Sequence, residues 1–283
     1  MDDLKVRRLR LAAHWPMIEP REGVWNFEEI DAQLDMAHER GASVVLAVGR
    51  RLPRWPECHV PEWANTLAQE EQQTKILSYL EAVVHRYKDH PAVVMWQVEN
   101  EPFLTVFAYE HCGDLDEAFL AREVALVRSL DPTRQVLVTD SGNLGLWSGA
   151  YRSGDVFGTS VYVYLWNEVT GPIKSLLPPH VYVLKQALMR LLFGAKDTIL
   201  IELSAEPWMN MSLRDAPLEL QYERMNEGVF EDVLVYAQKT RFDTQYLWGA
   251  EWWYWLKEKQ NMPGMWERAR ALYTTPSLPA SDL

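Results

Sequence analysis

The sequence has 283 residues, of which 48% are hydrophobic, and it carries a formal net charge of −12. The apolar fraction supports a packed core and excludes a disordered chain. The negative charge argues against nucleic acid and anionic membranes as partners, because both repel an acidic protein.

Strand patterns and amphipathic helix patterns alternate along the chain. The first helix is introduced by Asn26 and Glu29 as a capping box, and Gly41 ends it. The predicted strands are Val6–Ala13, Ser43–Val48, Ala92–Trp96, Gln135–Thr139, Asp155–Tyr162, Thr198–Ile201 and Gln245–Trp253. The remaining predicted helices are Gln73–Lys88, Asp114–Leu130, Val181–Leu192, Leu218–Lys239 and Met265–Tyr273.

These repeating strand–helix units predict an α/β fold with a parallel sheet and helices outside it. No linker or change of composition interrupts residues 1–283, so we expect a single domain. The seven predicted strands favour a (β/α)8 TIM-barrel type, although a closed barrel needs eight. A doubly wound sheet is the alternative. As a nucleotide binder it would need a glycine-rich phosphate turn, and neither common form of that motif occurs.

Two predicted strands end in a glutamate. The apolar strand at Ala92–Trp96 leads to Glu101, and Thr198–Ile201 leads directly to Glu202. Burying a carboxylate costs free energy unless the charge is used or paired, and parallel α/β folds keep their chemistry at the carboxyl ends of their strands. Either glutamate alone is more simply a salt-bridged residue. Two of them on strands three apart predict a paired-carboxylate site, as retaining glycoside hydrolysis requires.

The sequence resembles the clan A glycoside hydrolases, the retaining barrels that include families 5 and 42. The resemblance rests on Asn100-Glu101-Pro102 after one strand and on Glu202 at the end of the strand three further on. It implies that Glu101 is the acid/base and Glu202 the nucleophile. Glu206 is the rival nucleophile, but it lies in the loop beyond the strand.

The same resemblance implies roles for four further residues. Arg10 would orient the nucleophile, and Asn100 would donate to the sugar 2-hydroxyl. Tyr162 would touch the nucleophile, with Tyr164 as its competitor, and Trp253 would form the floor of the sugar site. Each of these residues could instead serve packing alone.

The sequence departs from the clan at its beginning. In the resemblance, Val6–Ala13 corresponds to the second strand of the barrel, so we expect an N-terminally incomplete barrel of about seven strands. A missing strand leaves unpaired backbone groups on both sides of the gap. We therefore expect an open barrel or self-association at the open edge.

Other charged residues allow more than one interpretation. Arg50, Arg51 and Arg54 stand where clan members often carry a histidine. They could bind an acidic or hydroxylated substrate or pair with loop acids. Glu251 is expected to contact a ligand hydroxyl or to join an ion pair, and His14 to lie near substrate.

The two cysteines each lie beside a histidine, as Cys58-His59 and His111-Cys112. A zinc site is conceivable, but neither pair has the spacing of a zinc motif. A disulfide is more plausible than zinc, and two free thiols more plausible still in a reducing cell. No metal ligand set and no cofactor are predicted.

The sequence thus predicts a retaining β-glycosidase with a carbohydrate substrate. The alternative is a catalytically weak or inactive carbohydrate-binding barrel, and a metal-dependent barrel hydrolase is a third hypothesis. No signal peptide and no apolar stretch of about 18 residues is recognised, so we expect a cytoplasmic protein that does not cross a membrane.

Overall fold

The computed structural model describes residues 1–104, 112, 116–167, 171–209 and 211–274. Among them, seven strands form one sheet in the order β1-β2-β3-β4-β5-β8-β9, and every neighbouring pair is parallel. These strands are β1 (Arg8–Ala12), β2 (Ser43–Val48), β3 (Val93–Val98), β4 (Gln135–Asp140), β5 (Val156–Val161), β8 (Thr198–Ser204) and β9 (Gln245–Trp248). The fold is an incomplete (β/α)8 barrel, as the sequence predicts.

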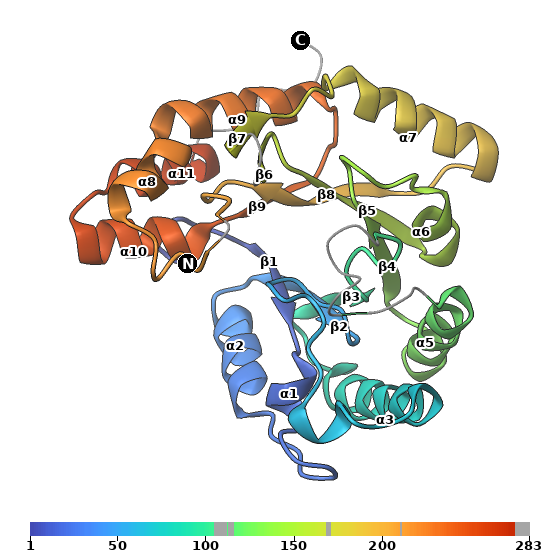
Figure 1. The fold of residues 1–283 in the computed structure, drawn as a ribbon. Helices are drawn as coiled ribbons and strands as arrows, with labels where there is room; N and C mark the ends of the chain where they lie inside the picture. The colour runs from blue at the N-terminus through green and yellow to red at the C-terminus, as the bar shows by residue number, and fades with distance from the viewer. Residues whose placement is uncertain (105–111, 113–115, 168–170, 210, 275–283) are drawn as a thin grey trace.

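Helices lie around the outside of the strands (Figure 1). They are α1 (Trp15–Ile18), α2 (Glu28–Glu39), α3 (Gln69–Tyr87), α5 (Glu117–Leu130), α6 (Ser148–Ser153), α7 (His180–Phe193), α8 (Leu218–Arg224), α9 (Glu227–Lys239), α10 (Ala250–Gln260) and α11 (Gly264–Thr274). A 3-10 turn, η1 (Glu62–Ala64), and a hairpin of β6 (Tyr164–Asn167) and β7 (Gly171–Lys174) lie in the connections.

Two apolar clusters hold these layers together. The larger one lies between the strands and the helices and includes Trp96, Val98 and Tyr79. A smaller one contains Val45 and Leu137 with neighbours from β5 and β8. Side chains alternate between the two faces of a strand. The sheet can therefore contribute apolar side chains to both clusters and still present polar side chains at its carboxyl end.

The predicted strand Gln245–Trp253 is wrong in its second half. The strand ends at Trp248, and Gly249 follows with φ +137°, a conformation that L residues rarely adopt. Helix α10 begins immediately after it. Trp253 therefore lies on a helix, which changes what its side chain contacts.

The predicted helix Leu218–Lys239 is in fact two helices. Met225 is extended, with φ −144°, and Asn226 caps α9 by accepting a hydrogen bond from Val229 N at 3.1 Å. An asparagine side chain competes well for backbone donors at a helix start, so one residue is enough to divide the segment.

Helix α7 has the predicted bounds within a residue at each end, but its leucines do not pack into the core. Tyr182, Gln186 and Met189 form its buried stripe. Leu184 and Leu191, by contrast, are 64% and 82% exposed. The amide of Gln186 takes the inner position because it donates to Thr240 O at 3.0 Å.

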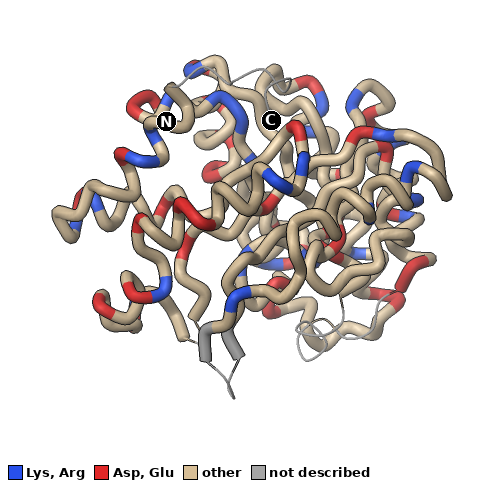
Figure 2. The backbone as a smooth tube through the Cα atoms, turned by 90° about the horizontal axis from the view of Figure 1, so that it is seen from above, with Lys and Arg blue, Asp and Glu red and all other residues tan. Residues whose placement is uncertain are grey.

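Charged residues of both signs are interspersed along the backbone in the view from above (Figure 2). In the part of the chain that the structure describes, none of the helices is long and apolar enough to cross a membrane.

Candidate active site

The two predicted carboxylates lie at the carboxyl ends of β3 and β8. Glu202 belongs to β8 and is in register with Ser160 of the neighbouring β5. Glu101 follows β3, and its backbone N–H donates to Thr139 Oγ1 of β4 at 2.8 Å. Both side chains are buried, with 6% of Glu101 and 7% of Glu202 exposed. The fold thus brings the two glutamates to one end of the sheet.

Glu202 is held by two partners. Arg10 Nη1 donates to Glu202 Oε2 at 2.6 Å, and the Tyr162 hydroxyl donates to Glu202 Oε1. The Tyr162 hydroxyl keeps its proton, because burial and then the Glu202 charge raise its pKa well above the ordinary value. A cation and a neutral hydroxyl both stabilise an ionised carboxylate, so Glu202 is organised as an anion.

One guanidinium orders several polar groups of the site. Besides Glu202, Arg10 contacts Asn100 Oδ1 through Nη2 at 2.6 Å and Gln97 Oε1 through Nε at 2.8 Å. Because Oδ1 of Asn100 accepts from Arg10, its amide N–H groups are the part suited to meet a ligand hydroxyl. Gln97 was not singled out from the sequence, although a polar residue inside an apolar strand is a usable signal.

Glu101 has a different environment. Its Oε1 has no hydrogen-bond partner among the described residues, and its backbone φ is +47°. Burial and then the Glu202 charge raise the pKa of Glu101 to about 8, against a lowering effect of the Ser160 hydroxyl. Glu101 therefore keeps its proton at neutral pH. The two carboxyl groups thus occupy different environments, since Glu202 is paired with Arg10 and Tyr162 whereas Oε1 of Glu101 has no partner among the described residues.

Trp253 lies on helix α10 and not at the end of a strand. Its side chain is 1% exposed, its Nε1 donates to Ala205 O at 2.8 Å, and its ring lies 5.2 Å from that of Phe230. It packs in the core because α10 replaces the second half of the predicted strand. The aromatic residue at the carboxyl end of β9 is Trp248, which the sequence analysis missed.

Glu206, the rival nucleophile, lies beyond β8. It accepts hydrogen bonds from Trp248 Nε1 at 2.6 Å and from Arg54 Nη1 at 3.3 Å. Burial raises its pKa. Neither Arg10 nor Tyr162 contacts it in the described structure, so the two groups that would stabilise a nucleophilic anion belong to Glu202.

Comparison with known proteins decides the family. Residues 1–151 match the family described as Glyco_hydro_42: Beta-galactosidase. The chain belongs to this family. It is a clan A glycoside hydrolase by sequence family and by fold.

Relatives of this Glyco_hydro_42 chain include Beta-galactosidase Pbg of Clostridium perfringens, 31% identical over 104 residues, or 31% of this chain and 15% of the relative. Probable mannan endo-1,4-beta-mannosidase F of Aspergillus flavus is 34% identical over 100 residues, or 35% and 19%. The match therefore spans less than a fifth of either relative.

A GH5_18 structure from Streptomyces cattleya, in complex with Manb1-4GlcNAc, has the same fold. It superposes with a TM-score of 0.58 and 16% sequence identity, covering 86% of this chain and 75% of that chain. At this identity the likeness concerns the barrel fold alone.

Two of the arginines after β2, Arg51 and Arg54, pair with acidic side chains. Arg51 Nη2 lies 2.7 Å from Glu57 Oε2, and Arg54 reaches both Glu206 and Glu251. Glu251 is exposed, so its contact with Arg54 is a surface ion pair of little energetic weight. The His14 ring lies against that of His59, with ring centres 4.3 Å apart and a tilt of 55°, and its Nε2 contacts Pro53 O.

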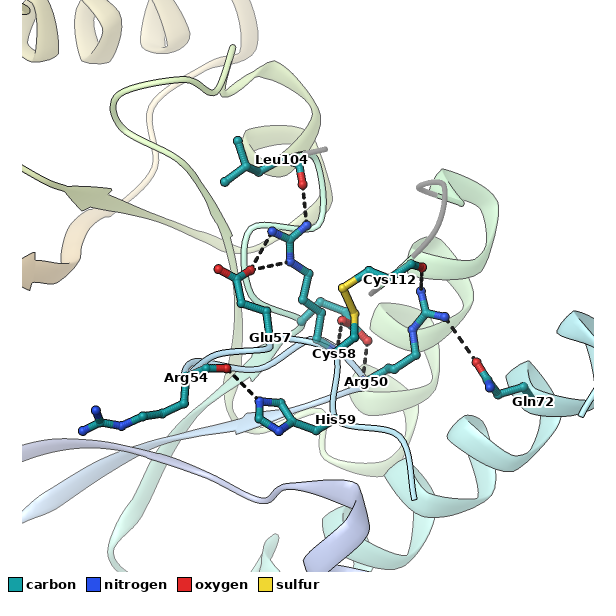
Figure 3. Close-up of a disulfide and its surroundings, with 10 residues drawn as sticks. Arg50, Arg54, Glu57, Cys58, His59, Gln72, Leu104 and Cys112 are labelled. Atoms are coloured by element: carbon teal, nitrogen blue, oxygen red, sulfur yellow. Dashed lines mark hydrogen bonds and ion pairs between the residues drawn. A yellow bond between two sulfur atoms is a disulfide. The ribbon is translucent and has the colours of Figure 1, made fainter. Parts of the chain in front are cut away.

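The cysteines of the glycoside hydrolase form a disulfide between Cys58 and Cys112, with Cα atoms 5.4 Å apart (Figure 3). The expectation of two free thiols is therefore wrong, and Cys58 and Cys112 are not thiolate ligands for zinc. His111 lies outside the described residues. Among the residues that are described, no group of three potential metal ligands occurs.

Proposed function

We propose that this chain is a retaining β-glycosidase in which Glu202 is the nucleophile and Glu101 the acid/base. The observation that carries the proposal is the asymmetry of the pair. Glu202 is held by the Arg10 cation and the Tyr162 hydroxyl. Among the described residues Glu101 forms no ion pair, and its raised pKa of about 8 favours the neutral acid. A pair of carboxyl groups in such different environments suits the roles of general acid and nucleophile.

The reaction would take two steps. A carboxylate oxygen of Glu202 attacks the anomeric carbon while Glu101 gives its proton to the departing glycosidic oxygen, so the C–O bond breaks and a glycosyl ester forms. Glu101, now ionised, then removes a proton from water, whose oxygen attacks the anomeric carbon and releases Glu202. Asn100 and Trp248 would contact the sugar, and no cofactor takes part.

The substrate class follows from chemistry and relatives together. The relatives are named as β-galactosidases and as a probable mannan endo-1,4-beta-mannosidase, so we propose β-galactosides first and β-mannosides second. An aryl β-glycoside screen with both sugars tests this choice. Sugar binding without any turnover would instead favour the carbohydrate-binding barrel.

The roles are tested by azide rescue. Glu202→Ala should lower kcat for an aryl β-galactoside by at least about 10³-fold, because the attacking group is gone. Added azide should restore turnover and yield the α-glycosyl azide, since azide then takes the place of Glu202. In Glu101→Ala azide should yield the β-glycosyl azide by intercepting the glycosyl ester.

Glu206→Ala separates the two candidate nucleophiles. It should retain turnover without azide, although with weaker substrate binding. If Glu206→Ala behaves like a nucleophile variant, or if Glu202→Ala keeps its rate, the assignment of Glu202 is wrong.

A further inference from the structure

A third carboxylate, Glu99, holds the loop that follows β2. Arg50 N donates to Glu99 Oε1 at 2.7 Å, and Arg51 N donates to Glu99 Oε2 at 2.6 Å. Each carboxylate oxygen therefore accepts one backbone N–H. Hydrogen bonds to an ionised acceptor are the stronger kind, so this bidentate contact fixes the backbone of residues 49–51.

Gly49 makes this contact sterically feasible. Its φ is +129°, and a Cβ atom at this position would lie 2.5 Å from Glu99 Oε1. Any other residue would therefore collide with the carboxylate as well as strain the backbone. The loop passes closer to Glu99 than a side chain at position 49 would allow.

The loop in turn holds the acid/base turn. Glu99 N donates to Val48 O at 2.9 Å, and Asn100 N donates to Arg51 O at 2.7 Å. Both Glu99 and Glu101 have positive φ, +58° and +47°, which costs free energy in non-glycine residues. A turn with two such residues persists only when its surroundings hold it, and residues 48–51 supply part of that support.

Glu123 of α5 is a buried neighbour of Glu99. It is 1% exposed, and burial, the Glu99 charge and a hydrogen bond to Glu99 raise its pKa well above the ordinary value. Arg50 acts in the opposite direction and Asp116 in the same one, but both act more weakly. The raised pKa of Glu123 favours the neutral acid next to the Glu99 carboxylate.

The side chains of the loop are also anchored. Arg50 reaches Cys112 O at 2.9 Å and Gln72 Oε1 at 3.2 Å (Figure 3). Arg51 Nη1 reaches Leu104 O at 2.5 Å, three residues after Glu101. Residues on both sides of Glu101 are thus tied to the segment that Glu99 holds.

We propose that Glu99 is a positioning residue for the acid/base Glu101, acting through the backbone of Arg50 and Arg51. The inference rests on the proposed function for the role of Glu101. The contact of Glu99 with the backbone N–H groups of Arg50 and Arg51, called the clamp below, does not depend on enzymatic activity. Glu99 contacts no reacting atom; it fixes where the proton of Glu101 points.

The kinetic test compares two leaving groups in Glu99→Gln. Glutamine replaces one of the two acceptor oxygens with an NH2 donor, so one of the Arg50 and Arg51 N–H groups loses its acceptor, the loop should loosen and Glu101 should be misplaced. With a phenyl β-glycoside, which needs protonation of its leaving oxygen, kcat/KM should fall by about 10²-fold. With a 2,4-dinitrophenyl β-glycoside, whose phenolate leaves unprotonated, it should fall by less than about threefold.

Glu123→Gln and Glu117→Gln are the matched variants. Glutamine at position 123 is neutral and close in size to the glutamate, so it should leave both rates near those of the unchanged enzyme. Glu117 is an exposed residue at the start of the same helix, so Glu117→Gln controls for the loss of one acid on α5. An equal loss with both substrates in Glu99→Gln would overturn the positioning role.

Amide hydrogen exchange tests the clamp without any turnover. The Arg50 and Arg51 amides should be protected in the unchanged chain, should exchange at least about tenfold faster in Glu99→Gln, and should keep their protection in Glu117→Gln. Unchanged exchange in Glu99→Gln overturns the inference. An inactive chain that shows these exchange changes would retain the clamp and reject the proposed enzymatic function instead.

Discussion

Arg10 contacts three polar side chains of the candidate active site. A guanidinium presents several N–H groups in a rigid plane, and here they meet Glu202 of β8, Gln97 of β3 and Asn100 just after β3. Removing one member of a buried ion pair leaves the other charge uncompensated, which is costly. Arg10 therefore cannot be replaced by lysine without losing the planar contacts that align the nucleophile with Asn100.

The protonation of Glu101 predicts a pH profile. The neutral acid is needed for the first step, and its raised pKa of about 8 means that the proton is lost as the pH rises through that value. We expect kcat/KM for a phenyl β-glycoside to be level at neutral pH and to fall above pH of about 8, with one apparent pKa that belongs to the coupled pair.

A 2,4-dinitrophenyl β-glycoside provides the control for this profile. Its first step does not need the proton of Glu101, so the basic limb should weaken or vanish. The same basic limb with both substrates, or a limb that begins near pH 5 with the phenyl substrate, would contradict the assignment of Glu101 as the acid.

At the scale of elements, two tryptophans differ in role because Trp253 lies on a helix and Trp248 at the end of a strand. Trp253 on α10 is a buried core residue, so Trp253→Ala should destabilise the fold by about 3–5 kcal/mol in denaturant unfolding. Trp248 stands at the strand end, with the Arg54 guanidinium 4.4 Å from its ring centre. Trp248→Ala should chiefly lower kcat/KM, by roughly five- to tenfold, because a ring contact is worth about 1 kcal/mol.

Unfolding and kinetics measured on both variants separate these effects. If Trp253→Ala kept its stability and lost activity, Trp253 would be the sugar-contacting residue after all. The opposite pattern in Trp248→Ala, a large loss of stability with unchanged kinetics in the folded fraction, would remove Trp248 from the site.

The barrel strands could be predicted because apolar runs of four to seven residues recur between amphipathic helices. Glu202 could be located because it directly follows the apolar run of its strand, and Glu101 because it stands in Asn100-Glu101-Pro102 just beyond the end of β3. The predictions that were wrong concern features determined by a single residue or by a contact between residues distant in sequence. Asn226 divides α8 from α9, Gly249 ends β9 early, and the Cys58–Cys112 bond joins residues 54 apart in sequence.

Helix α7 shows a different limit of sequence patterns. Its period is helical, but the pattern does not say which face meets the barrel. The side that carries Leu184 and Leu191 is as apolar as a core face, and yet both residues are exposed. The contact of Gln186 with Thr240 O, made with a residue that follows α9, decides the orientation instead. Such a long-range hydrogen bond is not visible in a local window.

At the scale of the whole molecule, the described part of the barrel is not closed by strand pairing between β1 and β9, and we call this gap the seam. Within the described residues, β1 and β9 are the two ends of the sheet, and no strand pairs with their outer edges. Arg8 Nη1 and Thr244 Oγ1, 3.5 Å apart, contact each other across it. Arg7 O accepts from Ser43 N, and Ala13 N donates to Ala47 O. Because pairing alternates along a strand, the N–H groups of Arg8, Arg10 and Ala12 face the seam.

We propose that this seam associates with a second copy of the chain. Unpaired strand edges present donors and acceptors that another strand can satisfy. The unchanged chain should show a mass above that of a monomer at high concentration in sedimentation equilibrium. Arg8→Pro removes one edge N–H at the start of β1, where proline is tolerated, and should weaken association about tenfold. Arg8→Ala removes the same charge but keeps the N–H, so it should associate normally. A monomer at every concentration, or equal weakening in both variants, would show that the seam does not pair.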